Sequence, residues 1–201
     1  MDTRQSVFPV VVLLCLAADP GRSDAQSAGT SAAPTTEEAP GAAVPTPPAT
    51  VIRTAGGVTI RAVRIPEPLR IDGRLEETHY STVPAISDFI QQEPEEGEPA
   101  TEKTEAWIFF DNRNIYVAAR CWDSHPERAI ENEMRRDGLN INQNENFTVI
   151  FDPFHDRRNG LVFQTNSLGG LRDMAVTDEG NPSLDWNTVW DARTSRFDEG
   201  W

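Results

Sequence analysis

The chain has 201 residues, enough for one sizeable domain, and it carries a formal net charge of -14 at pH 7. This acidity argues against nucleic acid as a partner, because phosphates require a basic footprint, and against electrostatic docking on anionic lipid. It is compatible with an exported domain that stays in solution and with cation binding by carboxylates.

The N-terminus has the pattern of a secretory signal peptide from Met1 to about Ala25. Arg4 supplies a positive charge, and Val7 to Ala18 is an apolar stretch that is too short to span a membrane. Cleavage is expected after Ala18 or Ala25. We therefore expect export, to the periplasm or the outer membrane.

A low-complexity stretch from Gln26 to Thr50 follows, composed almost wholly of Ala, Pro, Thr, Ser and Gly. Such a sequence buries little apolar surface, which predicts a disordered linker. The folded domain is then expected from Val51 to Trp201.

The clearest structural prediction is a β-hairpin. Thr104 to Phe110 and Ile115 to Trp122 are rich in aromatic and β-branched residues, and the polar turn Asp111–Asn114 separates them. Both faces of the two arms are largely apolar. A strand of this kind is expected inside a sheet, with a second layer packed against it.

Other short segments alternate with turn residues such as Asp72-Gly73 and Asn159-Gly160. One helical turn is expected within Leu75–Tyr80. This spacing predicts an all-β fold, an antiparallel β-sandwich. The expected strands are Val58–Val63, Leu69–Ile71, Glu131–Asp137, Phe147–Phe151, Leu161–Asn166, Leu171–Val176 and Thr188–Phe197.

The last of these strands is followed by the turn residues Asp198-Glu199-Gly200 and then by Trp201. A hairpin at this turn requires a return strand. We therefore expect a domain truncated at its C-terminus, in which Thr188–Phe197 is an unpaired edge.

Several segments together resemble a family-nine-like carbohydrate-binding module, in the version found at the N-terminus of exported bacterial proteins with an uncharacterised, barrel-forming C-terminal region. The resemblance covers about Ile65 to Trp201. The segments that carry it are Ile71–Glu77, Thr104–Asp111, Ile115–Asp123, Arg135–Asp137, Phe151–Gly160, Asn166–Gly169 and Asp185–Trp190.

This resemblance implies a β-sandwich, export, binding of a polysaccharide or oligosaccharide, and often a structural calcium ion. Members of the family clamp a sugar between two tryptophans. The sequence departs from the pattern at Tyr80, which stands where a Trp is common.

Trp186 and Trp190 are the first candidates for sugar binding. Sugar rings present C–H faces that lie on aromatic planes, and a spacing of four in an extended segment places both indoles on one side. The alternative is that the two indoles cap the core, as large aromatic side chains usually do.

Arg135, Arg136, Asp137, Arg172 and Asp173 offer forked donors and paired acceptors that suit the hydroxyl groups of a ligand. The alternative is an Arg–Asp ion-pair network that ties the sheets together. The predicted ligand-binding set is Trp186, Trp190, Arg136, Arg172, Asp173 and Asn166.

The loop from Asp137 to Glu145 carries side-chain oxygens at near-alternate positions, which suits calcium. Its predicted ligands are Asp137, Asn142, Asn144 and Glu145. The alternative is that Asn is simply a favourable loop residue.

No catalytic residue is predicted. Asp152 and Asp156 bracket a polar corner, but abundant carboxylates make such pairs frequent, and no nucleophile triad or phosphate-binding glycine loop is present in the sequence. Cys121 lies on a predicted core strand, and we expect a buried free thiol.

Three functions follow from this sequence. The first is a non-catalytic carbohydrate-binding module, attached to a glycoside hydrolase of carbohydrate catabolism. The second is a periplasmic N-terminal domain of an outer-membrane β-barrel protein, with a structural or protein-binding role toward its own barrel. The third is a hydrolase in its own right.

Overall fold

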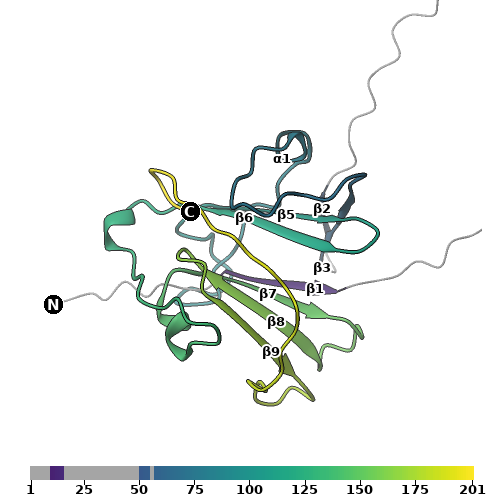
Figure 1. Cartoon of the computed structure of the whole chain (residues 1–201). Coiled ribbons are helices and arrows are strands. Elements are labelled where there is room, and N and C mark those ends of the chain that lie inside the picture. Colours follow the sequence, from purple (N-terminus) through teal and green to yellow (C-terminus); the bar gives the residue numbers. More distant parts are fainter. Residues whose placement is uncertain (1–9, 16–49, 55–56) are drawn as a thin grey trace, which may run out of the picture.

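The computed structural model describes residues 10–15, 50–54 and 57–201, and most of its regular structure is β-strand (Figure 1). The predicted all-β fold is therefore confirmed. Most of the predicted signal peptide and linker lies outside the described residues. Thr50 already belongs to the folded domain, because its side chain is buried and donates a hydrogen bond to the carbonyl of Pro84 at 2.7 Å.

The predicted hairpin is confirmed as β5 (Thr104–Phe110) and β6 (Ile115–Cys121), which pair antiparallel in a three-stranded sheet. The third strand is β4 (Val63–Arg64), parallel to β5 on its other side. The turn is fixed locally, because one carboxylate oxygen of Asp111 accepts the backbone N–H groups of Arg113 and Asn114 at 2.6 and 2.7 Å.

A second, four-stranded sheet has the order β1-β7-β8-β9. Three of its strands form an antiparallel meander: β7 (Asn146–Asp152), β8 (Gly160–Asn166) and β9 (Leu171–Val176). The fourth, β1 (Val10–Cys15), pairs parallel to the outer edge of β7. The apolar centre of the predicted signal peptide thus forms a strand of this sheet (Figure 1).

The two sheets face each other across a core built from β5, β6 and β7 (Figure 1). The buried side chains of this core are Ile86, Ala106, Ile108, Cys121, Phe147 and Val149. The opposite face of β5 is buried as well, because Trp107 and Phe109 pack in a second cluster with Tyr80 from the short helix α1 (Thr78–Thr82). This double burial matches the expectation from the two apolar faces of the hairpin.

The remaining elements are short. A separate hairpin joins β2 (Val51–Thr54) to β3 (Gly57–Ile60), and two 3-10 turns, η1 (Pro126–Arg128) and η2 (Leu139–Gln143), lie between β6 and β7. Within the part of the chain that the structure describes, no helix has the length and apolarity needed to cross a bilayer.

Three of the strands predicted before β7 differ from the structure. Val58–Val63 is divided between β3 and β4, because the chain leaves its pairing with β2 and begins to pair with β5 around Ala62. Leu69–Ile71 is a loop that contributes the buried Leu69 side chain to the second cluster. Glu131–Asp137 is also a loop, which ends in a left-handed residue at Asp137 (φ 57°).

The predicted last strand, Thr188–Phe197, is not a strand. This segment runs across the open side of the molecule without a backbone ladder (yellow in Figure 1). Side chains hold it instead: the Thr194 hydroxyl donates to the carbonyl of Ser167 at 3.0 Å, and the Ser195 hydroxyl donates to that of Gly73 at 2.5 Å. The expectation that it forms an unpaired strand edge is therefore wrong.

Candidate ligand-binding site

Trp186 and Trp190 lie side by side against one aromatic ring of the sheet. Both indoles meet the ring of Phe163 edge-on, with centroid distances of 6.1 and 5.2 Å. Phe163 lies on β8, on the face that looks toward the other sheet, and both indoles are partly buried. The spacing of four predicted this shared side, and the contact with Phe163 shows that the pair also covers the margin of the core.

Asp173 anchors the segment that carries these indoles. One of its carboxylate oxygens accepts hydrogen bonds from Arg136 and from the indole N–H of Trp190, the latter at 3.2 Å. The other oxygen accepts the backbone N–H of Thr188 at 2.8 Å. The side chain of Asp173 is completely buried, so its charge is balanced by Arg136 and by these donors rather than by water.

Arg136 joins the same group from the loop before β7. Its guanidinium lies over the ring of Trp190, 5.8 Å from the centroid, and it donates to the side-chain oxygen of Asn187 at 3.1 Å. Its side chain remains 36% exposed. Arg136 therefore pairs with Asp173 and is also partly open to solvent. Part of its guanidinium, which is a hydrogen-bond donor, lies at the surface near the indoles.

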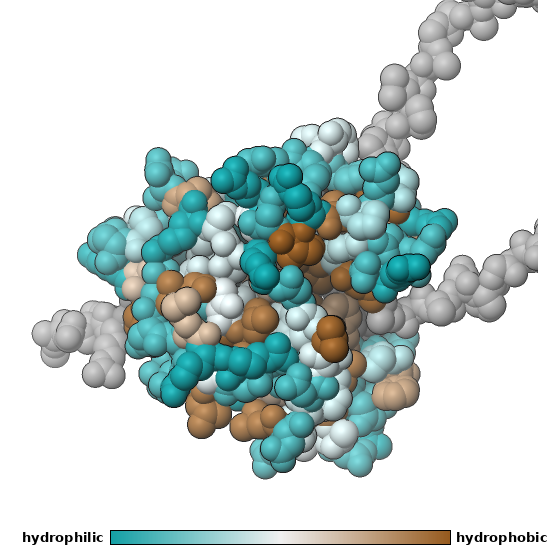
Figure 2. Space-filling model, in the orientation of Figure 1, coloured by the Kyte–Doolittle hydropathy of each residue, from teal (hydrophilic) through white to brown (hydrophobic). Residues whose placement is uncertain are grey.

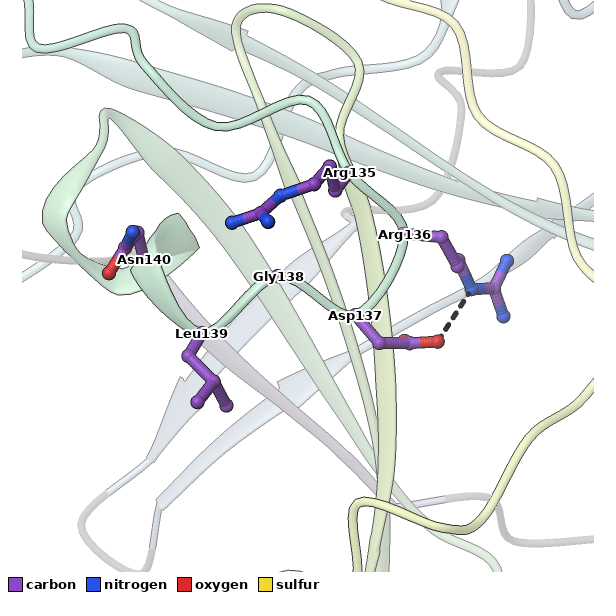
Figure 3. Close-up of a pocket in the computed structure, with 6 residues that line it drawn as sticks. All are labelled: Arg135, Arg136, Asp137, Gly138, Leu139 and Asn140. Carbon is purple, nitrogen blue, oxygen red and sulfur yellow. Dashed lines mark ion pairs between the residues drawn. The ribbon is translucent and has the colours of Figure 1, made fainter.

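A shallow pocket of about 400 Å³ lies along the same loop (Figure 3). In Figure 3, Arg136 and Asp137 point to one side of the loop, while Arg135 extends toward η2 on the other side. The face of the molecule seen in Figure 2 is largely hydrophilic, with scattered apolar patches. The residues that line the pocket are Arg135, Arg136, Asp137, Gly138, Leu139 and Asn140.

Arg172 lies apart from Asp173, because neighbouring residues of a strand point to opposite faces of the sheet. It pairs across the ladder with Gln164, and both side chains are buried. Nε and Nη1 of Arg172 and Oε1 of Gln164 lack hydrogen-bond partners in the described structure. The polar face of this sheet thus contains unmatched donors and an unmatched acceptor at adjacent positions.

Asn166 is fully buried, and both the nitrogen and the oxygen of its amide are hydrogen-bonded. Its nitrogen donates to the carbonyl of Glu133 at 2.6 Å and to the side chain of Asn144 at 3.2 Å, and its oxygen accepts the N–H of Gly170 at 2.8 Å. These bonds fasten the loop before η2 to the end of β8. In this arrangement Asn166 positions the loop and offers no free group to a ligand.

The predicted calcium ligands have separate partners. Asp137 pairs with Arg136, and the side-chain oxygen of Asn142 accepts a hydrogen bond from Gln164 at 2.9 Å. The side-chain oxygen of Asn144 accepts the backbone N–H groups of Asn132 and Glu133, at 3.0 and 3.1 Å. Among the described residues, no group of three or more His, Cys, Asp and Glu side chains could hold a metal ion. The loop in this arrangement does not present a shared set of free oxygens, and calcium binding stays a prediction.

Glu145 lies instead beside other carboxylates. Burial raises its pKa above the ordinary value, and the negative charges of Asp123, Glu131 and Glu102 raise it further. Glu131 is itself paired with Arg196 at 2.7 Å. This ion pair ties the loop before η2 to the segment that follows Trp190.

The carboxylates of the polar corner after β7 accept hydrogen bonds from backbone N–H groups. Burial alone would raise the pKa of Asp152, but the N–H groups of Arg157 and Asp156 outweigh it and hold that pKa below its ordinary value. The pKa of Asp156 is lowered by the N–H groups of Arg158 and Asn159. Both side chains therefore stabilise the turn geometry that leads into β8.

Cys121 is a buried free thiol, as predicted. Burial, reinforced by the charge of Glu145, raises its pKa to about 12. A thiol with this pKa is an inert part of the core.

Sequence reasoning missed Phe163, Asn187 and Gln164. Phe163 supports both indoles, Asn187 holds Arg136, and Gln164 bonds both Asn142 and Asn146 at 2.9 Å. Phe163 and Gln164 fall within a strand that was predicted correctly, where alternation alone assigned them to opposite faces. Their roles depend on segments that are distant in sequence.

Comparisons with models of known protein families, with curated proteins and with solved structures found no match for this chain.

Proposed function

We propose that this chain is a non-catalytic carbohydrate-binding module of the family-nine-like type, carried by an exported bacterial protein and serving a glycoside hydrolase. The observation that carries this proposal is that Trp186 and Trp190 share the ring of Phe163, while Arg136, which lines a shallow pocket, lies over the ring of Trp190. Aromatic planes suit the apolar faces of sugar rings, and a partly exposed guanidinium suits their hydroxyl groups.

Of the two indoles, Trp186 is the better stacking surface. Trp190 already carries Arg136 over its ring and donates its N–H to Asp173. In the proposed mode, Trp186 stacks on the ligand, while Asp173 and Phe163 hold Trp190 and Arg136 in place. Arg136 then donates to hydroxyl groups at the rim of the pocket.

Binding through such a platform is weak. Much of the sugar stays in contact with water, and each hydroxyl group exchanges water for protein at small net gain. We expect affinities in the micromolar to millimolar range, about -4 to -8 kcal/mol.

The test is calorimetric titration of the full chain with soluble β-glucan and xylan oligosaccharides, and of Trp186→Ala beside it. If Trp186 is the platform, the substitution removes most binding and leaves stability nearly intact. If Trp186 is mainly a core cap, the substitution costs about 3–5 kcal/mol of stability, as expected for a buried Trp.

A matched control is Trp122→Ala. Trp122 is also partly buried, but it contacts Phe197 and lies under Lys103, away from Phe163. The control should leave sugar binding unchanged. No binding to any oligosaccharide, together with a large loss of stability in Trp186→Ala, contradicts the proposal.

The second candidate is a periplasmic N-terminal domain of an outer-membrane β-barrel protein, with a structural or protein-binding role. The outer edge of β7 favours it, because that edge accepts an extended apolar strand. The sequence of the full-length protein that contains this domain distinguishes the two candidate functions. A catalytic domain in it supports the first, and strands that alternate as in a membrane barrel support the second.

A further inference from the structure

The outer edge of β7 is paired by β1 along nearly its whole length. The register runs from Val10 opposite Phe147 to Cys15 opposite Asp152, so that six residues of β1 match six of the seven residues of β7. The pairing is parallel, and it makes β7 an interior strand of the sheet.

The two edges of the β7–β8–β9 meander are covered differently. Segments of the folded domain itself cover β9: Asp137 donates its N–H to the carbonyl of Leu171 at 2.8 Å, and Ser183 exchanges two backbone hydrogen bonds with Ala175. Within the described residues, the outer edge of β7 is paired by β1 alone.

The sequence of β7 contains none of the features that keep strand edges from pairing. It reads Asn-Phe-Thr-Val-Ile-Phe-Asp, with no Lys, Pro or Gly, and its single charge lies at its last residue. Such an edge is a ready template for another strand. The partner it fits is an extended apolar segment, which is what Val-Val-Val-Leu-Leu-Cys supplies.

We propose that the outer edge of β7 is a strand-binding surface and that its occupant is Val10–Cys15 of the same chain. This segment lies within the predicted signal peptide. Cleavage after Ala18 or Ala25 separates it covalently from the domain and frees the edge. Uncleaved and cleaved chains then differ in whether this surface is open to a partner strand. The proposal is independent of sugar binding.

Hydrogen exchange tests the proposal on the full chain, produced in the cytoplasm so that no signal peptidase acts. The variant is Val11→Pro with Val12→Pro. Successive N–H groups of a strand point to opposite sides, so one of the two prolines removes a donor that faces β7, and the rings disturb the strand. Every second amide of β7 should lose protection by at least ~10-fold, while the amides between β8 and β9 keep theirs.

The control variant places the same two prolines at Ala17 and Ala18, beyond the end of β1. It should leave exchange in β7 unchanged. Undiminished protection of β7 in a monomeric Val11→Pro, Val12→Pro chain overturns the proposal. Protection that is restored only in a dimer, at high protein concentration, supports a strand-binding surface that a second copy fills.

A second experiment does not depend on how the proline variant folds. Leu13 is opposite Ile150 in the register, so Leu13→Cys with Ile150→Cys in a Cys15→Ser chain should form an intramolecular disulfide on mild oxidation. The matched pair Leu13→Cys with Phe154→Cys places the second thiol on the exposed corner after β7 and should not cross-link. Equal cross-linking of the two pairs contradicts the assigned register.

Discussion

The β5–β6 hairpin and the C-terminal segment, residues 184–201, are both extended, but they are held in different ways. The hairpin has a continuous backbone ladder from Thr104 opposite Cys121 to Phe110 opposite Ile115, and its turn is fixed by its own Asp111. The C-terminal segment has only isolated backbone bridges, at Ser183 beside its start and at Phe197 and Gly200 near its end. Between them it is held by hydrogen bonds that involve side chains: its own Thr194 and Ser195 donate to distant carbonyl groups, and the distant Asp173 accepts one of its backbone N–H groups.

This difference predicts different responses to substitution. A ladder distributes its stability over many hydrogen bonds and a buried face, so that damage to it unfolds the domain as a unit. A segment held at a few points can open locally while the remainder stays folded. Substitutions in the two regions therefore separate global from local stability.

The largest effect is expected from Phe109→Ala in the hairpin. Phe109 is 0% exposed and packs against Tyr80 and His79. Its removal should lower the free energy of unfolding by about 3–5 kcal/mol, measured by urea denaturation. Ile115→Ala on the neighbouring strand is the control, since Ile115 is 46% exposed and should cost far less. Equal losses would contradict the assigned core.

Asp173→Ala should have the next largest effect, about 2–3 kcal/mol, because it removes the acceptor of three hydrogen bonds, one of them from a charged group. The amide of Thr188 should lose its protection from hydrogen exchange, whereas the amides of β5 and β6 retain theirs. Asp191→Ala is the control, since Asp191 is an exposed partner of Arg193. Uniform loss of protection across the chain would show that the segment does not open separately.

Gly73→Ala tests where the C-terminal segment crosses the loop before α1. Gly73 has a φ of 80°, and a Cβ there would lie 2.9 Å from the carbonyl carbon of Thr194. Gly97 has a similar φ of 87° but no neighbour within 4 Å. Gly97→Ala should therefore show backbone strain alone, about 1 kcal/mol, and Gly73→Ala should cost about 1 kcal/mol more. Thermal denaturation of both variants measures the difference.

The smallest effect is expected from Glu145→Gln, at the junction of the two regions. The pKa of Glu145 is raised in the folded protein, so its charged form is disfavoured there and reduces stability above that pKa. The neutral Gln should therefore stabilise the protein at pH 7, by about 0.5 kcal/mol. The gain should shrink as the pH falls through the raised pKa and Glu145 takes up a proton. A gain that grows on acidification would reverse this assignment.

Regions with a local pattern were predicted well from the sequence. The hairpin, β7, β8 and β9 each combine alternation or a buried apolar run with turn residues at their ends, and their predicted bounds fall within a residue or two of the observed strands. The free thiol of Cys121 followed from its place on one of these strands. The shared side of Trp186 and Trp190 followed from their spacing.

The tertiary structure decided everything that depends on partners distant in sequence. Thr188–Phe197 has the composition of a strand, but its backbone faces no ladder, and Asp173, Ser167 and Gly73 hold it through side chains. Val10–Cys15 has the composition of a signal peptide, and an unprotected edge on β7 makes it a strand. A sequence specifies which segments can extend and which side chains can pair. Only the folded chain determines which of them meet, because the hydrogen bonds of an extended segment lie outside that segment.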